Sequence, residues 1–185
     1  NEQTTYEKIH NSLLELQNYV CDATVKYISN KSENEYDTKQ YSKISGEYRV
    51  EVTGPENLAG NVTLSDGTTI AQFNPKIGGK VSVSSKDSQE RSEIFLTMFI
   101  KNYFTSHDVT VSVAKVDDSK CTVFEASIPG EHPYLASEKL WVDNETLKPV
   151  KLVIYDPEGS ERIVVNYKTI EYNIELDDSI FRAEV

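Results

Sequence analysis

Few residues in this sequence could carry out acid–base or metal chemistry. The three histidines, His10, His107 and His132, are widely separated, so no spacing typical of a metal site, such as His-x-x-x-His, occurs. The carboxylate pairs Asp117-Asp118 and Asp177-Asp178 stand beside turn residues, where aspartate commonly accepts local backbone hydrogen bonds. A general acid and base would also need a shared cleft that separates their pKa values. The pattern therefore predicts no catalytic residue, no metal and no cofactor, and we expect that the protein is not an enzyme.

The two cysteines are typical of core packing rather than of chemistry. Cys21 and Cys121 are a hundred residues apart, and each lies within a run typical of a strand. Two thiols at this separation form neither a disulfide framework nor a metal motif. We expect buried free thiols, and a disulfide between the two residues is the alternative.

The net charge of the chain limits its partners. Its 185 residues include 19 basic and 30 acidic side chains, which gives a formal charge of −11. A nucleic-acid site needs a basic stripe that neutralises phosphates, so this balance argues against nucleic acid and against binding driven by anionic lipid. No apolar run reaches the roughly 18 residues of a membrane span. Because the chain begins at a polar Asn1, we expect that any lipid anchor preceded it and was removed, and that only such an anchor would bring the protein to a membrane.

Most of the chain shows the period-two hydrophobicity of strands. A capping pattern at Thr4 and Glu7 first begins a helix, whose apolar stripe runs from Tyr6 to Leu16 at three- and four-residue spacing. Alternating strands follow, separated by turns such as Asp66-Gly67 and Asp156 to Gly159. The predicted strands are residues 19–27, 36–44, 48–52, 62–64, 69–73, 80–84, 109–116, 122–128, 140–143, 147–155 and 163–167.

A second helix is predicted over residues 87–104, where Asp87 and Glu90 could cap its start. Its centre is apolar on nearly all sides, so it is expected to be buried on more than one side. The residues that could form a cavity or lid there are Ile94, Phe95, Met98, Phe99 and Tyr103. The favoured interpretation is that they fill the core of a curved sheet. The alternative is that this helix plugs a cavity that holds an acyl chain.

These elements together predict one α+β domain over residues 1–185. Strands joined almost entirely by hairpin turns, with no alternation of strand and helix, favour an antiparallel sheet. We expect a single strongly curved sheet of about eleven strands, an open half-barrel with two helices, one of them packed in the concave face. The closing strands, residues 140–185, must bury their apolar face, and the second helix is the expected cover.

The order of these elements and several turn motifs carry a family resemblance. The motifs are Gly-Glu-Tyr-Arg-Val at 46–50, Leu-Ser-Asp-Gly-Thr at 64–68, Phe-Asn-Pro at 73–75, and the closing run from Leu140-Trp-Val-Asp to Asn173-Ile-Glu-Leu-Asp-Asp-Ser-Ile-Phe181. The sequence resembles the LolA/LolB-like lipoprotein-carrier superfamily and, within it, the GerS-like spore-germination lipoproteins of Clostridia. The resemblance covers most of the chain.

The resemblance implies an extracytoplasmic protein, lipid-anchored to a membrane of the developing spore on the forespore side. It implies a non-enzymatic role in germination: binding and activating a cortex-modifying N-acetylmuramoyl-L-alanine amidase, so that muramic-δ-lactam forms in the spore cortex peptidoglycan. The alternative is a carrier of a lipid or lipoprotein acyl chain in an apolar cavity. Two departures favour partner binding: Ile70-Ala71 replaces an aromatic pair of the carriers, and Arg49, the rough counterpart of their cavity arginine, alternates onto the polar face.

The expected partner surface is a sheet face rich in tyrosine. Its candidate residues are Tyr36, Tyr41, Tyr48 and Arg49, since tyrosine serves protein interfaces well and charged rims contribute to specificity. An open sheet also leaves backbone groups unpaired at its edges, so a homodimer formed through these edges is a further expectation.

Overall fold

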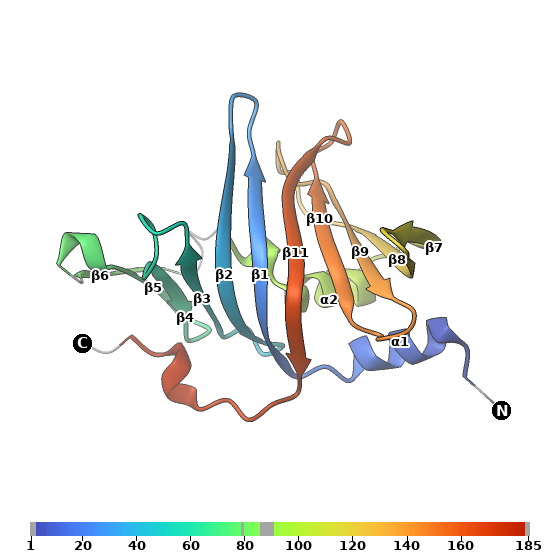
Figure 1. Cartoon of the computed structure of the whole chain (residues 1–185), viewed down its shortest axis with the longest axis horizontal. Coiled ribbons are helices and arrows are strands. Elements are labelled where there is room, and N and C mark those ends of the chain that lie inside the picture. The colour runs from blue at the N-terminus through green and yellow to red at the C-terminus, as the bar shows by residue number, and fades with distance from the viewer. Residues whose placement is uncertain (1–2, 79, 86–90, 184–185) are drawn as a thin grey trace.

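The computed structural model describes residues 3–78, 80–85 and 91–183, and within them eleven strands form one antiparallel sheet (Figure 1). The strands are β1 (Asn18–Ile28), β2 (Glu33–Lys43), β3 (Tyr48–Gly54), β4 (Val62–Ser65), β5 (Thr69–Asn74), β6 (Lys80–Ser85), β7 (Val109–Val116), β8 (Ser119–Ser127), β9 (Ser137–Asp143), β10 (Pro149–Tyr155) and β11 (Glu161–Tyr172). The helices are α1 (Thr5–Leu14) and α2 (Leu96–Thr105), with short 3₁₀ turns at Pro75–Ile77, Arg91–Ile94 and Asp178–Phe181. The predicted α+β fold is confirmed.

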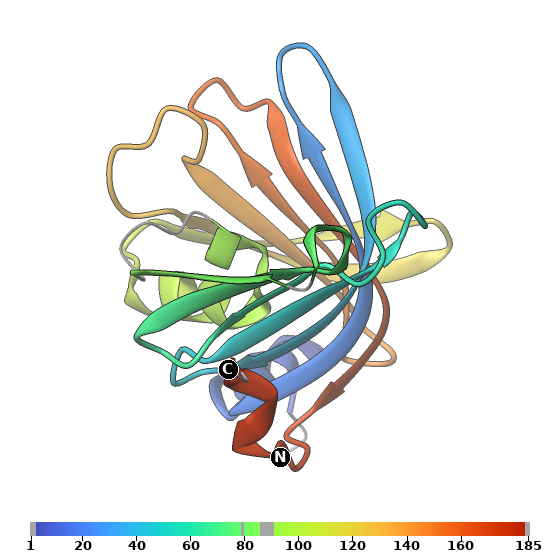
Figure 2. The ribbon, with the colours of Figure 1, turned by 90° about the vertical axis from the view of Figure 1, so that its left-hand side faces the viewer.

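The sheet consists of two meanders that join at its centre. Its order is β6-β5-β4-β3-β2-β1-β11-β10-β9-β8-β7, so β1 pairs with β2 on one side and with β11 on the other. The outer strands, β6 and β7, do not pair with each other, and the sheet stays open. Figure 2 shows the sheet curving around α2, which lies on the concave side. The helix α2 therefore covers the inner face of the closing strands, as predicted.

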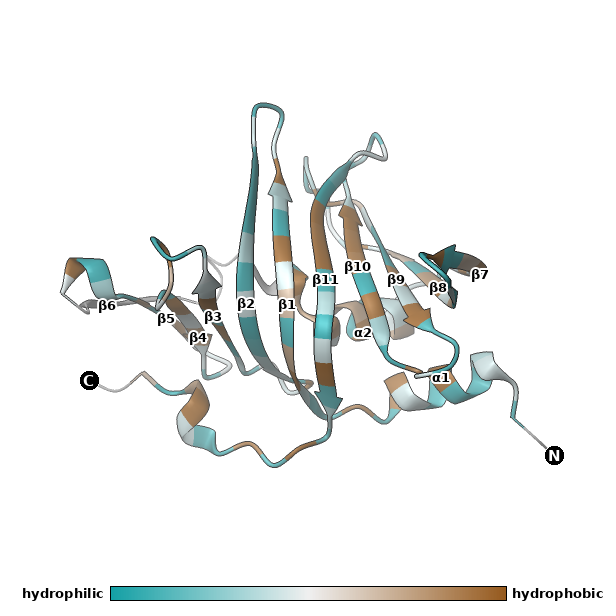
Figure 3. Cartoon of the chain, viewed as in Figure 1, coloured by the Kyte–Doolittle hydropathy of each residue, from teal (hydrophilic) through white to brown (hydrophobic). Residues whose placement is uncertain are grey.

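Alternation of side chains decides which face of each strand is buried. On β1, Tyr19, Cys21, Ala23 and Val25 are at most 2% exposed, whereas Asp22 between them is exposed. The bands of opposite hydropathy along the central strands in Figure 3 follow the same alternation. We call the buried, concave side the inner face and the convex side the outer face.

Local side-chain hydrogen bonds set the turns and the first helix. The Thr4 hydroxyl accepts a hydrogen bond from the Glu7 N–H at 3.1 Å, which confirms the predicted cap of α1. Asp66 Oδ1 accepts bonds from the N–H groups of Thr68 and Thr69, both at 2.9 Å, and closes the predicted hairpin between β4 and β5. Leu147, in contrast, has φ of 62° in the turn, so β10 begins at Pro149 and the predicted strand start at residue 147 was wrong.

The second helix is shorter than the sequence predicted. Arg91–Ile94 forms a 3₁₀ turn, Phe95 is extended with φ −85° and ψ 135°, and α2 begins at Leu96. The Tyr19 hydroxyl accepts the Leu96 N–H at 2.9 Å, so a strand residue takes the place of a helix cap. The predicted caps Asp87 and Glu90 lie outside the described residues. Among the described residues, no helix has the length and apolar character needed to cross a membrane.

Candidate functional site

α2 fills one half of the concave face. Ile94, Phe95, Phe99 and Tyr103 are between 0% and 7% exposed and belong to the central hydrophobic core, and Met98 is partly buried. Aromatic contacts hold the group in place: Phe95 lies 4.7 Å from the Tyr48 ring and Tyr103 lies 5.5 Å from the Phe124 ring, measured between centroids. These predicted cavity residues are thus core residues, as the core-filling interpretation expects, and Ile94 also lines a hollow.

The other half of the concave face contains a hollow of about 290 Å³, which we call the inner hollow. Strands β1 to β5 and the loop between β3 and β4 enclose it. Its lining residues are Val25, Tyr27, Tyr36, Thr38, Val50, Val52, Leu58, Asn61, Val62, Thr63, Gln72, Phe73, Asn74 and Ile94. The lining mixes apolar side chains with amides and hydroxyls, so it is not the purely apolar cavity that the acyl-carrier interpretation expects.

A polar ladder on β2 runs from the inner hollow to α2. The inner-face side chains Thr38, Gln40 and Ser42 are at most 5% exposed. Gln40 Nε2 donates to the Thr38 hydroxyl at 3.1 Å, and the hydroxyls of Ser42 and Thr97 on α2 lie 2.7 Å apart. Gln40 Oε1 is buried without a hydrogen-bond partner among the described residues. Buried polar groups of this kind are unfavourable beside a hydrocarbon chain, because nothing on that chain can satisfy them.

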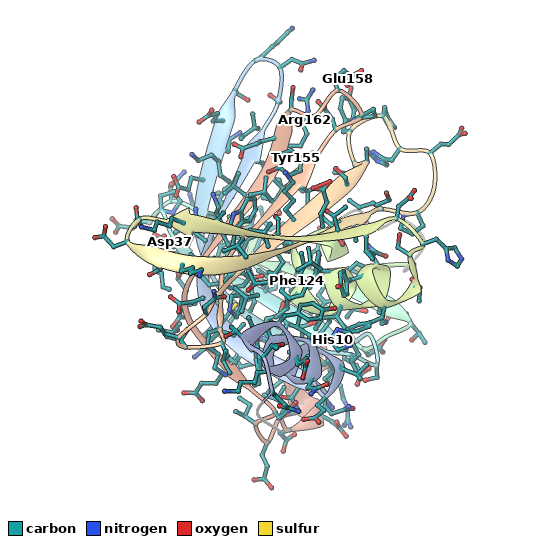
Figure 4. All side chains as sticks on the ribbon, turned by 90° about the vertical axis from the view of Figure 1, so that its right-hand side faces the viewer. His10, Asp37, Phe124, Tyr155, Glu158 and Arg162 are labelled. Carbon is teal, nitrogen blue, oxygen red and sulfur yellow. The ribbon has the colours of Figure 1, made fainter. Side chains whose placement is uncertain are left out.

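A second, more open hollow of about 560 Å³ lies at the end of the β1–β2 hairpin, and we call it the upper hollow. It is lined by Tyr27, Ile28, Ser29, Asn30, Lys31, Asn34, His132, Tyr134, Leu135, Arg162 and Ile163. Arg162 is already engaged: its Nε donates to the buried Asp156 carboxylate at 2.8 Å and its Nη2 to Asn30 Oδ1 at 3.0 Å. Arg162, Glu158 and Tyr155 lie together at this end of the molecule in Figure 4.

A buried polar pair ties α2 to the sheet. Glu138 on β9 is 0% exposed, and its Oε1 accepts a hydrogen bond from Asn102 Nδ2 at 3.1 Å. Burial raises the pKa of Glu138 to about 8, and the nearby Glu93 carboxylate adds to the rise. Sequence reasoning missed this residue. The alternation of Glu138, Leu140 and Val142 could have placed it on the inner face, since the last two are core residues.

The predicted partner-surface residues do not share one face. Tyr48 is only 4% exposed and packs in the core, so its prediction as a surface residue was wrong: it alternates with Val50 onto the inner face of β3. Tyr36 lines the inner hollow. Tyr41 and Arg49 are cross-strand neighbours on the outer face, and both are partly buried.

The remaining candidates for chemistry lie apart. Both cysteines are buried free thiols, on β1 and β8, as expected. The ring of His10 packs against Phe104 at 5.2 Å, near the α1–β8 junction where Figure 4 shows His10 and Phe124. Asp177 Oδ1 accepts the Ser179 N–H at 2.8 Å within a 3₁₀ turn. Among the described residues, no three His, Cys, Asp or Glu side chains gather in a way that could hold a metal ion.

Comparison with known proteins decides the family. The family model of the sporulation protein YdcC-like family matches residues 1–181, nearly the whole chain. The chain belongs to the YdcC-like sporulation proteins. None of the curated proteins matches it in sequence.

Solved structures share the fold of this chain. The chain is 30% identical to GerS, from the structure of the CwlD amidase of Clostridioides difficile in complex with the GerS lipoprotein, with a TM-score of 0.57 over 94% of this chain and 98% of that one. A conserved protein from Thermus thermophilus has 11% identity and a TM-score of 0.59, covering 98% and 95% of the two chains. A domain described as an outer membrane lipoprotein-sorting protein, from Vibrio parahaemolyticus, has 11% identity and a TM-score of 0.52, covering 96% and 97%. The predicted relationship to GerS is confirmed, and the fold is shared with the lipoprotein-sorting domain.

Proposed function

We propose that this YdcC-like protein binds and activates an N-acetylmuramoyl-L-alanine amidase during spore formation, and that it has no catalytic activity of its own. The observation that carries the proposal is the 30% identity to GerS, which was solved in complex with an amidase. Membership in a sporulation family supports the cellular setting. In this proposal the amidase modifies the cortex so that muramic-δ-lactam forms, and the protein is lipid-anchored on the forespore side.

The disposition of the acidic residues supports a non-enzymatic role. Asp177 is used in the cap of the last 3₁₀ turn, and Asp178 forms an ion pair with Lys43 at 3.2 Å. Asp143 and Asp156 accept backbone N–H bonds within their own turns, which lowers the pKa of both carboxyls. These groups hold turns together rather than meeting in a cleft.

We place the partner surface on the outer face around Tyr41 and Arg49. Lys39 Nζ lies 5.6 Å from the Tyr41 ring centroid, and Arg49 Nε pairs with Glu51 at 2.7 Å. Arg49 Nη1 also donates to the Ile180 carbonyl at 3.2 Å, which joins the C-terminal turn to this face. Aromatic and cationic side chains held in fixed positions suit an interface, because little side-chain entropy is lost on binding.

A binding titration of the chain with its cognate amidase tests this proposal. Tyr41→Ala is expected to weaken binding by about tenfold, a loss typical of one interface anchor. Thr24→Ala, an outer-face change on the neighbouring strand, is the matched control and should leave the affinity unchanged. Wild-type chain that does not bind the amidase would exclude the proposed function, whereas binding that is insensitive to Tyr41→Ala would exclude only this surface.

We also propose that two copies pair through strand β7, at the edge of the sheet. Val109, Val111 and Val113 are 39%, 42% and 62% exposed, and they lie on one face of a strand whose other edge is unpaired within the described sheet. An antiparallel pairing centred on Val111 would set these valines against their counterparts in the second copy. A long apolar edge of this kind favours strand addition.

The alternative, a carrier of an acyl chain, would place the chain in the inner hollow. Extraction of the purified protein with organic solvent, followed by mass spectrometry, tests it directly. One bound acyl chain per molecule is the result that the carrier function requires.

A further inference from the structure

The two hollows adjoin at Tyr27, which lines both of them. Tyr27 lies between them, with the inner hollow along the inner face of β1 to β5 and the upper hollow at the end of the β1–β2 hairpin; we call the two hollows together the cleft. Its lining is rich in two side-chain types, aromatic rings and primary amides. These residues are Tyr27, Tyr36 and Tyr134, with Asn30, Asn34, Asn61, Gln72 and Asn74.

Several of the amides have unused hydrogen-bonding capacity. The side chains of Asn34, Asn61 and Gln72 form no hydrogen bond to any residue that the structure describes. A primary amide offers two donors and an acceptor with two lone pairs, so each of these groups can both donate to and accept from a ligand. A row of such groups matches a ligand whose hydroxyls and amides also act as both donor and acceptor.

The aromatic rings offer exposed faces in the same cleft. Tyr134 is 52% exposed, with the Arg162 guanidinium 5.4 Å from its ring centroid on one side, and Tyr36 is partly buried. The rings of Tyr27 and Tyr36 hold each other at 5.9 Å in an edge-to-face arrangement, which fixes their orientation. The C–H face of a pyranose ring packs on such aromatic surfaces while its hydroxyls reach neighbouring amides.

Other ligand classes fit this lining less well. An acyl chain would bury the amides without a partner, at an energetic cost for each group. A polyphosphate would meet a chain of net charge −11, and the guanidinium of Arg162 is already occupied by Asp156 and Asn30. The combination of amides and aromatic rings, with no free buried cation among the lining residues described, favours an uncharged, amide-bearing sugar.

We propose that this cleft binds a glycan strand built from N-acetylhexosamine units, with a sugar ring in the inner hollow. The inner hollow of about 290 Å³ is close to the lower size limit of small-molecule sites, as suits one sugar residue with the rest of the strand continuing into the upper hollow. The choice of glycan rests on the proposed function, since an amidase that acts on peptidoglycan needs its glycan held nearby. The protein would then present substrate as well as bind the enzyme.

Isothermal titration calorimetry of the chain alone with N-acetylglucosamine tetramer tests the proposal. Saturable binding is expected, and Tyr134→Ala and Gln72→Ala should each weaken it by about tenfold. Both side chains are exposed, so the variants are expected to fold, which circular dichroism would verify. Tyr41→Ala is the matched control: it lies on the outer face and should leave sugar binding intact.

Three results would overturn the inference. They are the absence of heat with the tetramer at millimolar concentration, binding that both cleft variants leave unchanged, and saturable binding of palmitate in place of the sugar. Because no amidase is present in this titration, a negative result leaves the proposed amidase partnership standing. Weaker amidase binding in Tyr41→Ala, with sugar binding intact, would show that the two surfaces act separately.

Discussion

The buried carboxyl of Glu138 makes a sharp prediction about stability and pH. Its side chain is 0% exposed, it accepts one hydrogen bond from Asn102, and its Oε2 has no hydrogen-bond partner among the described residues. Because ionisation inside the core is unfavourable, the pKa of Glu138 rises from 4.5 to about 8. Folding therefore favours the protonated carboxyl, and the stabilisation is fully present below the unfolded pKa near 4.5.

That stabilisation is lost as the pH rises towards 8. Between the two pKa values the unfolded chain has released a proton that the folded chain retains, so the free energy of unfolding falls by about 1.4 kcal/mol per pH unit. The whole window corresponds to an upper limit of about 5 kcal/mol. Glu138→Gln keeps an acceptor for Asn102 but cannot ionise, so it should remove this pH dependence.

Urea unfolding of both proteins at about pH 5, 7 and 8.5 measures the effect. The variant should gain stability over the wild type as the pH rises, by about 2 kcal/mol or more near pH 8.5. Glu125→Gln on neighbouring β8 is the control, because Glu125 is 39% exposed in a surface pair with Lys139 and should contribute less than about 1 kcal/mol. A constant difference between Glu138→Gln and wild type across this range would refute the reasoning.

Core packing, the sheet edge and one hairpin turn each give a further prediction. Phe99→Ala should lower the free energy of unfolding by about 3–5 kcal/mol, because the Phe99 ring is 0% exposed. Met98→Ala should lower it by less, because Met98 is partly buried, and thermal unfolding compares the two variants. Val111→Lys should change the free energy of unfolding by no more than about 0.5 kcal/mol but convert a dimer paired through β7 to a monomer, as measured by light scattering. A wild-type protein that is already monomeric would contradict the pairing. Hydrogen bonds from Thr68 and Thr69 lower the pKa of Asp66 to about 2, so Asp66→Ala should destabilise the β4–β5 hairpin at neutral pH and have little effect near pH 2. Hydrogen exchange of the amides in β4 and β5 measures this change.

Local patterns predicted the parts of the fold that depend on neighbouring residues. The hairpin at Asp66-Gly67 and the cap at Thr4 follow from turn and capping chemistry within a few residues. The pairing of β1 with β11 joins opposite ends of the chain, and no short-range signal specifies it. The start of α2 was missed for a similar reason, because its cap is the hydroxyl of Tyr19, on a distant strand.

For the candidate sites too, local patterns predicted only what neighbouring residues determine. Tyr36, Tyr41 and Tyr48 were grouped because they are tyrosines close together in the sequence, but alternation places Tyr41 on the outer face and the other two on the inner face. The cleft was not predicted, since its amides come from β2, the β3–β4 loop and β5, which meet only in the folded sheet. The period-two pattern could have placed Glu138 on the inner face, although its raised pKa depends on the packing of α2 against it.

The most direct test of the proposed function is the activity of the cognate amidase on spore-cortex peptidoglycan, with and without this chain. Analysis of the released muropeptides should show little muramic-δ-lactam precursor from the amidase alone and a large increase when the chain is added in equimolar amount. The chain alone should release none. An amidase that is fully active by itself, and unchanged by the addition of the chain, would contradict the account.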